Sequence, residues 1–250
     1  MRIRYKPWAR PELEASNFYI DNPQDYKDKW KTLYENEAPF HIELGCGKGS
    51  FISQLALKNQ DINYLAVDLV DAMLGLAKRN IENLYKENDT EIKNVYLTRF
   101  DIERIFLILG IEDKVERIYI NFCNPWPRGK HHKKRLTHTR QLLKYREFLS
   151  KGGEIYFKTD DDGLFNDSLI YFEESGYEII KKTYDLANEE KFWDNIETEH
   201  EKMFKEQGIK IKALIARKLD EYKKDNEEKY QDKKKADENI EEQNEVEKIA

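Results

Sequence analysis

The feature that most restricts the fold is a regular alternation of short apolar runs with longer helical patterns. The apolar runs have the length and composition of buried strands, and amphipathic stretches separate them. Five runs are predicted to be strands: Phe40–Leu44, Asn63–Asp68, Asn94–Arg99, Arg117–Phe122 and Glu154–Thr159. Three stretches between them are predicted to be helices: Ser50–Lys58, Asp71–Glu87 and Thr137–Ser150. This order is typical of an α/β protein whose mostly parallel sheet carries helices on both faces.

The rest of the chain is organised around this predicted domain, residues 40–217. The polar and aromatic sequence before it is predicted to be an extension, residues 1–39, packed on the domain with a short helix near Asp25–Asn36. Two less regular apolar runs, Tyr177–Asp185 and Ile209–Lys218, are predicted to add edge strands.

The charge of the chain is unevenly distributed along its 250 residues. The formal net charge of −6 argues, taken alone, against a nucleic-acid partner. Residues 218–250 carry eight Lys and twelve acidic residues with little apolar content, so we predict a disordered or loosely helical tail. Residues 126–146, in contrast, hold eight Lys or Arg and no acid. A local excess of this size favours a polyanionic partner despite the net charge.

The remaining composition favours a soluble cytoplasmic protein that binds no metal. Two cysteines, Cys46 and Cys123, are too few for a disulfide framework and fit a reducing compartment. The N-terminus lacks the apolar segment of a secretory signal, and no stretch is long enough to cross a membrane. His131, His132 and His138 lie without Cys, Asp or Glu among them, so they do not form a metal-binding pattern. A monomer and a homodimer are both compatible with the sequence.

A glycine-rich turn follows the first predicted strand. It reads Glu43-Leu44-Gly45-Cys46-Gly47-Lys48-Gly49 and leads into the helix that begins at Ser50. Glycines at this place let the backbone turn tightly and approach a ligand at the carboxyl end of a strand. Asp68 ends the second strand, where a carboxylate can accept hydrogen bonds from ribose hydroxyls. Together these features predict a nucleoside-binding site.

Four sequence motifs, in order along the chain, resemble those of a known family. The glycine turn resembles E-x-G-x-G-x-G, the first motif of class I S-adenosylmethionine-dependent methyltransferases. The other three motifs resemble those of the bacterial tRNA (guanine-N7-)-methyltransferase family. They are Asn124-Pro125-Trp126-Pro127 with its basic continuation, Phe157-Lys158-Thr159-Asp160 and Thr198-Glu199-His200-Glu201. The opening residues Arg4 to Ala9 also resemble Gram-positive-type members, and the resemblance extends to about Arg217.

The resemblance implies a Rossmann-like fold with a seven-stranded sheet, S-adenosylmethionine as methyl donor, and a tRNA partner. The implied reaction methylates N7 of a guanine in the tRNA variable loop, conventionally nucleotide 46. The residues expected to face the donor are Glu43, Gly45, Gly47, Gly49, Asp68, Asp101 and Asn124. Those expected to face the target guanine are Arg128, Asp160, Thr198, Glu199, His200 and Glu201. Those expected along the tRNA are Lys130, His131, His132, Lys133, Lys134 and Arg135.

Two of these positions carry a second interpretation. Asp101 can cap the segment Ile102–Leu109 as well as lie near the donor adenine. Asn124 stands where the family has an Asp that is regarded as catalytic. The resemblance therefore makes Asn124 and Asp160 the candidate catalytic residues. Guanine N7 has a lone pair and no proton, so its methylation needs alignment rather than a general base. We therefore expect Asn124 to position a group rather than to ionise.

Two further departures from the family pattern keep the charge of the side chain. Asp68 replaces the usual Glu, and Arg128 replaces the usual Lys.

Three other functions fit parts of the pattern. Asn124-Pro125-Trp126 resembles half of the N-P-P-[YF] motif of methyltransferases that act on exocyclic amines such as adenine N6. A nicotinamide-dependent oxidoreductase fits the fold and Asp68, but its fingerprint is G-x-G-x-x-G rather than Gly45-x-Gly47-x-Gly49. A non-enzymatic RNA-binding protein would use the basic run but would not need the glycine turn.

Overall fold

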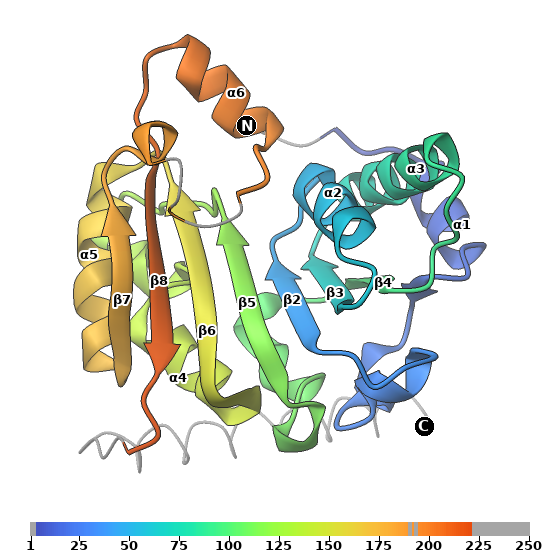
Figure 1. Cartoon of the computed structure of the whole chain (residues 1–250), viewed down its shortest axis with the longest axis horizontal. Coiled ribbons are helices and arrows are strands. Elements are labelled where there is room, and N and C mark those ends of the chain that lie inside the picture. Colours follow the sequence, from blue (N-terminus) through green and yellow to red (C-terminus); the bar gives the residue numbers. More distant parts are fainter. Residues whose placement is uncertain (1–3, 190–191, 193–194, 222–250) are drawn as a thin grey trace.

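Buried apolar runs assemble into a sheet of eight strands, which crosses the molecule in Figure 1. The structure is a computed structural model that describes residues 4–189, 192 and 195–221. The strand order is β1-β4-β3-β2-β5-β6-β8-β7, and β8 runs antiparallel to both of its neighbours in an otherwise parallel sheet. The strands are β1 (Tyr19–Ile20), β2 (Phe40–Leu44), β3 (Asn63–Asp68), β4 (Val95–Arg99), β5 (Val115–Asn121), β6 (Leu149–Thr159), β7 (Tyr177–Thr183) and β8 (Lys212–Lys218).

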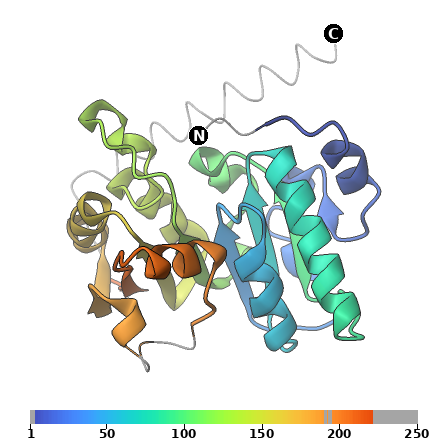
Figure 2. The ribbon, with the colours of Figure 1, turned by 90° about the horizontal axis from the view of Figure 1, so that it is seen from above.

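Helices cover both faces of this sheet, as Figure 1 and Figure 2 show. One group, α1 to α3, packs over β2, β3 and β4, and a second group, α4 and α5, lies behind β5 to β8. The remaining helix, α6, lies above the upper edge of the sheet. The helices are α1 (Ala9–Glu14), α2 (Ser50–Lys58), α3 (Asp71–Glu87), α4 (Thr139–Phe148), α5 (Asp162–Glu174) and α6 (Glu199–Glu206).

The predicted α/β architecture is confirmed, and β2, β3, α2 and α3 have the predicted bounds. The predicted count of seven strands is wrong by one, because Tyr19–Ile20 of the extension pairs with Leu97 and Thr98 of β4. Two residues are too short a run for an alternating pattern to show. The prediction of two edge strands is also wrong in part, since β8 inserts between β6 and β7.

The predicted helix near Asp25–Asn36 is replaced by two short 3-10 helices, Pro23–Tyr26 and Trp30–Leu33. Asp28 between them has a left-handed backbone with φ 63°, which a continuous helix cannot contain. β8 ends at Lys218, the last residue of the predicted run Ile209–Lys218. The rest of the predicted tail, residues 222–250, lies outside the described residues.

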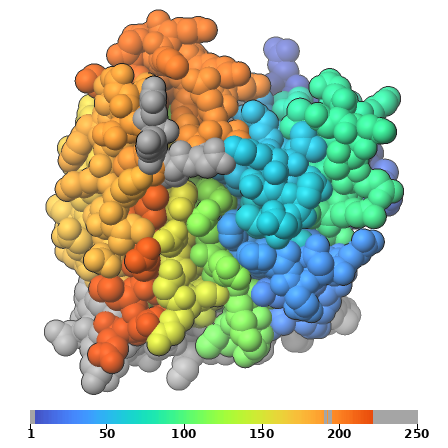
Figure 3. Space-filling model, viewed as in Figure 1, coloured from blue at the N-terminus to red at the C-terminus, as the bar shows by residue number. Residues whose placement is uncertain are grey.

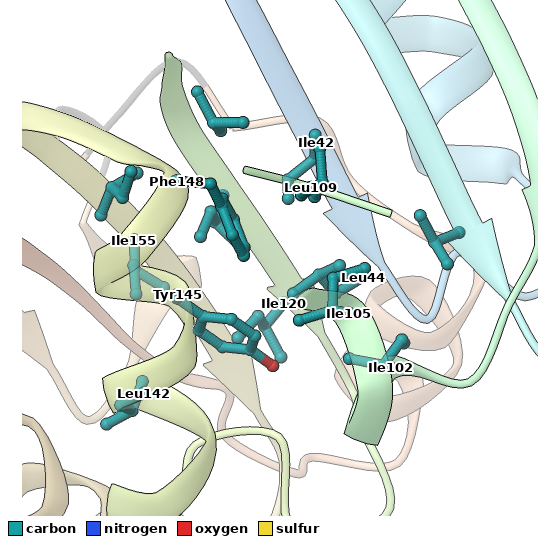
Figure 4. Close-up of a cluster of buried hydrophobic side chains, with 14 of the residues drawn as sticks. Ile42, Leu44, Ile102, Ile105, Leu109, Ile120, Leu142, Tyr145, Phe148 and Ile155 are labelled. Atoms are coloured by element: carbon teal, nitrogen blue, oxygen red, sulfur yellow. The ribbon is translucent and has the colours of Figure 1, made fainter. Parts of the chain in front are cut away.

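Alternation along the strands divides the core into two clusters. Along β2, Ile42 and Leu44 join the cluster that also contains Tyr145 and Phe148 of α4, drawn in Figure 4. The residue between them, Glu43, points to the opposite face. There, residues of β3, β4 and β5 pack against α1, α2 and α3; they include Leu13, Ile52, Ala66, Leu74, Ile81 and Leu97. Burial on both faces keeps the ends of the parallel strands in fixed register.

The N-terminal extension packs on the sheet through Trp30. This side chain is fully buried, and its indole N–H donates to the Ile108 carbonyl at 2.6 Å. The backbone N–H groups of Asp28 and Trp30 donate to the buried Asp113 carboxylate. Hydrogen bonds and apolar contacts therefore attach the extension to the domain.

Replacing Trp30 with Phe tests this attachment. The change leaves the Ile108 carbonyl without its donor and opens a small cavity, so the free energy of unfolding should fall by about 2 kcal/mol. Urea denaturation followed by circular dichroism measures the loss. Tyr5→Phe, at a side chain that is 80% exposed, is the control and should change stability by less than about 0.5 kcal/mol. Equal stability of the two variants would contradict the proposed attachment.

Candidate active site

The site lies where parallel strands of the sheet end side by side, at the upper edge in Figure 1. Parallel strands place their carboxyl ends together, and this edge is where open α/β sheets bind ligands. A cavity of about 150 Å³ opens there beneath the N-terminal end of α6. Its lining residues come from β2, the glycine turn, α2, the end of β5 and α6: Glu43, Gly45, Cys46, Gly47, Lys48, Ser50, Phe51, Asn121, Phe122, Thr198, Glu199 and His200.

The glycine turn forms one wall of this cavity and uses its glycines in different ways. Gly47 has φ 54°, and a Cβ there would meet no atom of the described residues within 4 Å, so its backbone faces open space. Gly49 has φ 72°, and a Cβ there would lie 2.7 Å from the Cβ of Ala77 in α3. Gly47 therefore leaves room for a ligand, whereas Gly49 permits close packing of two helices.

Asp68 holds the turn from the neighbouring strand. Its Oδ2 accepts a hydrogen bond from the Gly47 N–H at 2.9 Å, and its Oδ1 accepts one from the Val70 N–H at 2.9 Å. Burial raises the pKa of this carboxyl, and the backbone donors oppose that shift. Asp68 thus fixes the conformation of the glycine turn through its own side chain.

Glu43 provides a buried acceptor inside the cavity. The side chain is 2% exposed, and its Oε1 accepts from the Asn121 amide at 2.9 Å. Its Oε2 is buried and has no hydrogen-bond partner among the described residues. Burial raises the pKa of Glu43 to about 7, with the Asn121 hydrogen bond opposing it. An unpaired buried carboxylate oxygen is costly, so this arrangement favours a ligand that brings a donor or a positive charge.

Asp101 begins the 3-10 helix Ile102–Leu107 and caps it, because its Oδ1 accepts from the Glu103 N–H at 2.9 Å. The capping interpretation is confirmed. Asp101 does not line the 150 Å³ cavity.

The loop after β5 has an unusual backbone. Phe122 and Trp126 are left-handed, with φ 51° and 42°, which is rare for bulky side chains and concentrates at functional sites. Between them, Asn124 is exposed, and its Oδ1 accepts from the Trp126 N–H at 3.0 Å. The Asn124 side chain therefore shapes the Pro125–Pro127 turn through its amide oxygen.

The basic segment that follows divides into exposed and buried cations. Arg128, Lys130, Lys133 and Lys134 are exposed around the 3-10 helix Gly129–Lys134. His131 and His132 are half-buried, and His131 lies against the Trp126 ring with centroids 5.8 Å apart.

Arg135 differs from the other cations, because its side chain is only 3% exposed. It donates to the Pro125 carbonyl at 2.7 Å and pairs with Asp167 at 2.5 Å. The expectation that Arg135 lies along the tRNA does not fit this burial. Its contacts instead tie the proline-rich loop to α5.

The segment Thr198–Glu201 is also divided. Thr198 and Glu201 form a capping box at the start of α6: the Thr198 Oγ1 accepts from the Glu201 N–H at 3.1 Å, and Glu201 Oε2 accepts from the Thr198 N–H at 2.8 Å. Glu201 is 5% exposed and points away from solvent, so its expected contact with the target guanine does not fit. Glu199 and His200 are exposed at the cavity wall.

Asp160 follows the last residue of β6 and is half-buried. The carboxylate that caps α5 belongs to its neighbour Asp161, whose Oδ1 accepts from the Leu164 N–H at 2.6 Å. The Asp160 carbonyl accepts from the Lys212 ammonium at 2.9 Å, which anchors this corner to β8.

A second, larger cavity of about 350 Å³ lies on the face of the sheet that carries α2. Figure 3 shows atoms of β5, β6 and β8 exposed between α2 and β7 on this side. Arg117 and Tyr156 stack there, with the guanidinium 4.3 Å from the ring centroid. The glycine turn lines the smaller cavity but not this one, so we place the active site at the smaller one.

Three residues of the site were not predicted from the sequence: Asn121, Phe122 and Lys158. Asn121 holds Glu43, Phe122 lines the cavity, and Lys158 is fully buried behind it. A polar residue at the end of an apolar strand is the signal that identifies Asn121. The ring of Phe122 stacks on His200 of α6, with centroids 5.6 Å apart, a contact that no local pattern predicts.

Comparison with known proteins identifies the family. Residues 37–214 match the family described as putative methyltransferase. The tRNA (guanine-N(7)-)-methyltransferase of Clostridium beijerinckii is 58% identical over 218 residues, covering 87% of this chain and 99% of that protein. The chain belongs to the tRNA (guanine-N7-)-methyltransferase family. The member from Acetivibrio thermocellus is 52% identical over 218 residues, covering 87% of this chain and all of that protein.

Solved structures agree on the fold. A structure described as an antibiotic-related methyltransferase has a TM-score of 0.52 at 18% identity, covering 76% of this chain and 92% of that one. The 16S rRNA methyltransferase KamB has a TM-score of 0.56 at 13% identity, covering 76% and 93%. These similarities place the tRNA methyltransferase chain among Rossmann-like methyltransferase folds.

S-adenosylmethionine is the methyl donor of this family, and the cavity residues fit it. The Oε2 of Glu43, which has no partner among the described residues, would accept from the ammonium of the methionyl group, and the open backbone at Gly47 would leave room for that group. Among residues 4–189, 192 and 195–221, no cluster of His, Cys, Asp and Glu has the arrangement of a metal site. In the same residues, no helix is long and apolar enough to cross a membrane.

Donor affinity should depend on pH through Glu43. Because burial raises its pKa to about 7, the carboxyl is neutral below that pH and charged above it. Binding of S-adenosylhomocysteine, which carries the same ammonium, should weaken as pH falls from 8.5 to 5.5. Glu43→Gln should bind roughly tenfold more weakly at pH 8.5 and lose this dependence. Isothermal titration calorimetry measures both, and a flat profile for the unchanged protein would contradict the role of Glu43.

Proposed function

We propose that this protein transfers the methyl group of S-adenosylmethionine to N7 of a guanine at nucleotide 46 in the tRNA variable loop. The observation that carries the proposal is the place of Glu43 in a cavity at the strand ends, which is also lined by Phe122 just before the Asn124–Pro127 loop and its exposed cations. Relatives at 58% and 52% identity bear the name of this activity. In this proposal residues 40–217 carry the chemistry and the extension supports β4.

The reaction requires alignment rather than proton transfer. The N7 lone pair attacks the methyl carbon while the bond to sulfur breaks, so the sulfonium becomes a neutral thioether and the guanine gains the positive charge. Proximity and orientation supply most of the rate for such a displacement. A carboxylate near the target base stabilises the developing charge, and Asp160 at the end of β6 is the candidate. Asn124 holds the loop shape on which the base is presented.

The exposed cations supply the sequence-independent part of tRNA binding. Four exposed cations lie on one short segment that follows β5, where they can pair with phosphates: Arg128, Lys130, Lys133 and Lys134. In this proposal Arg128 lies nearest the target nucleoside, and the half-buried His131 and His132 lie along the tRNA.

Mapping the modified base tests the proposal directly. The protein is incubated with unmodified tRNA transcript and labelled methyl donor, and the product is digested and sequenced. We expect one labelled N7-methylguanosine in the variable loop. Label on adenine would instead support the exocyclic-amine reading that Asn124-Pro125-Trp126 suggests, and label outside the variable loop would overturn the proposed position.

Asn124→Asp tests whether position 124 acts by its charge. An Asp keeps the acceptor that the Trp126 N–H needs, so the loop should keep its shape. Because N7 carries no proton, we expect the single-turnover rate to change by less than about tenfold. A thousandfold gain would show that an ionised group is needed at this position.

The two kinds of cation should respond differently to mutation. Lys130→Ala combined with Lys133→Ala should weaken tRNA binding and lower the slope of log affinity against log salt by about two, one for each lost phosphate contact. Arg135→Ala should lower thermal stability, because it leaves Asp167 and the Pro125 carbonyl without their buried partner. If the folded Arg135 variant lost as much salt slope as the lysine variant, the division into exposed tRNA-binding cations and a buried structural Arg135 would be contradicted. Filter binding from 50 to 300 mM salt measures the slopes.

A further inference from the structure

Lys158 of β6 is a fully buried lysine with three acceptors. Its ammonium donates to the Asn195 Oδ1 at 3.0 Å, the Ile196 carbonyl at 3.0 Å and the Glu201 Oε2 at 2.6 Å. Asn195 and Ile196 belong to the chain segment that leads into α6, and Glu201 lies in the first turn of that helix. A buried ammonium is stable only when its donors are satisfied in this way, so the lysine and this segment depend on each other.

Glu201 is saturated by contacts within the protein. Besides the Lys158 ammonium, its Oε2 accepts from the Thr198 N–H, and its Oε1 accepts from the Asn195 amide at 2.8 Å. The carboxylate therefore has its acceptor capacity directed inward rather than toward a bound nucleoside. Its effect on a ligand has to pass through the residues that it holds in place.

The residues held in place form the wall of the donor cavity opposite the glycine turn. Thr198, Glu199 and His200 line the cavity together with Glu43. On the outside, Glu199 pairs with Lys48 of the glycine turn at 2.9 Å, with both side chains about half exposed. Such exposed pairs contribute little energy, so the buried Lys158 contacts are the stronger attachment of this wall.

We propose that Lys158 is a positioning residue for the methyl donor: its buried ammonium holds residues 195–201 so that Thr198, Glu199 and His200 close the cavity over the glycine turn. The proposal rests on the donor site of the proposed function. It assigns Glu201 to the same device, as the partner of Lys158 rather than as a contact of the guanine.

Lys158 also acts on Glu43 electrostatically. Its charge opposes the burial that raises the pKa of Glu43, while Asp68 of β3 acts in the opposite direction and Asn121 of β5 donates a hydrogen bond. Around the ammonium itself, burial lowers the pKa of Lys158, and the carboxylates of Glu201, Glu43 and Glu197 oppose that change. Removing the ammonium should thus move the ionisation of Glu43 to higher pH.

Lys158→Met keeps the length of the side chain and removes the charge. We expect the dissociation constant of S-adenosylhomocysteine to rise at least tenfold at pH 8. The pH at which binding is half lost should rise by about one unit. Calorimetric titration from pH 5.5 to 9 gives both values, and thermal denaturation shows whether the variant is folded at the temperature used.

A second variant protects the test against misfolding, because the single change leaves the Glu201 carboxylate buried without its cation. Lys158→Met with Glu201→Gln removes both charges and keeps an amide near Asn195 and Thr198. This double variant should regain thermal stability and part of the affinity, while the pH midpoint stays raised. The matched control is Lys218→Met at the opposite end of the sheet, whose ammonium donates to the Arg146 carbonyl at 2.7 Å.

The outcomes separate positioning from structural support. If Lys158 only stabilises the fold, the variants lose thermal stability, but the ligand affinity and pH midpoint of the folded protein match those of Lys218→Met, and the proposal is overturned. No tRNA enters these measurements. An unchanged protein that binds S-adenosylhomocysteine but does not methylate tRNA would therefore overturn the proposed function and leave the role of Lys158 to be judged by its own result.

Discussion

Burying a carboxylate costs free energy unless its oxygens accept hydrogen bonds or pair with a positive charge. The active site depends on how these partners are supplied to Glu43. The protein satisfies one oxygen with Asn121 from the next strand and leaves the other buried without a partner among the described residues, in a side chain that lines the cavity. The donor ammonium would complete the set. The cavity is therefore prepared for a positively charged ligand before that ligand arrives, which limits the reorganisation needed on binding.

The sheet topology makes this arrangement possible. β2 lies between β3 and β5, so Glu43 at the end of β2 has Asp68 on one side and Asn121 on the other. Parallel pairing brings the ends of all three strands to one edge, where the glycine turn and the Asn124 loop both emerge. The antiparallel return through β8 then brings the chain back from α6, which closes the same edge from above (Figure 1).

Local patterns predicted the parts of the protein that depend on local sequence. Burial on both faces of parallel strands explains why β2 and β3 could be placed to the residue, and the glycine turn with Asp68 follows from backbone geometry at a strand end. Arg135 and Glu201 were assigned to the tRNA and the target guanine by resemblance to the family. Both pair instead with residues distant in sequence, Asp167 and Lys158, and no local pattern predicts these two pairs.

One of these missed features did leave a local trace. Thr198-x-x-Glu201 has the spacing of a capping box, which satisfies two backbone donors at a helix start with its own side chains. That pattern alone directs Glu201 toward the backbone rather than toward a substrate. For Glu201, the hydrogen-bonding role that the local pattern predicts is therefore a better guide than the role inferred from resemblance.

We expect the methyl donor in the small cavity at the strand ends and not in the larger one on the sheet face. A crystal structure of the protein with S-adenosylhomocysteine would distinguish the two places. The ligand ammonium should lie within hydrogen-bonding distance of Glu43 Oε2, with Thr198, Glu199 and His200 over it and the Lys158–Glu201 pair retained. A ligand seated between Arg117 and Tyr156 instead, or a Glu43 Oε2 left without a partner, would contradict this expectation.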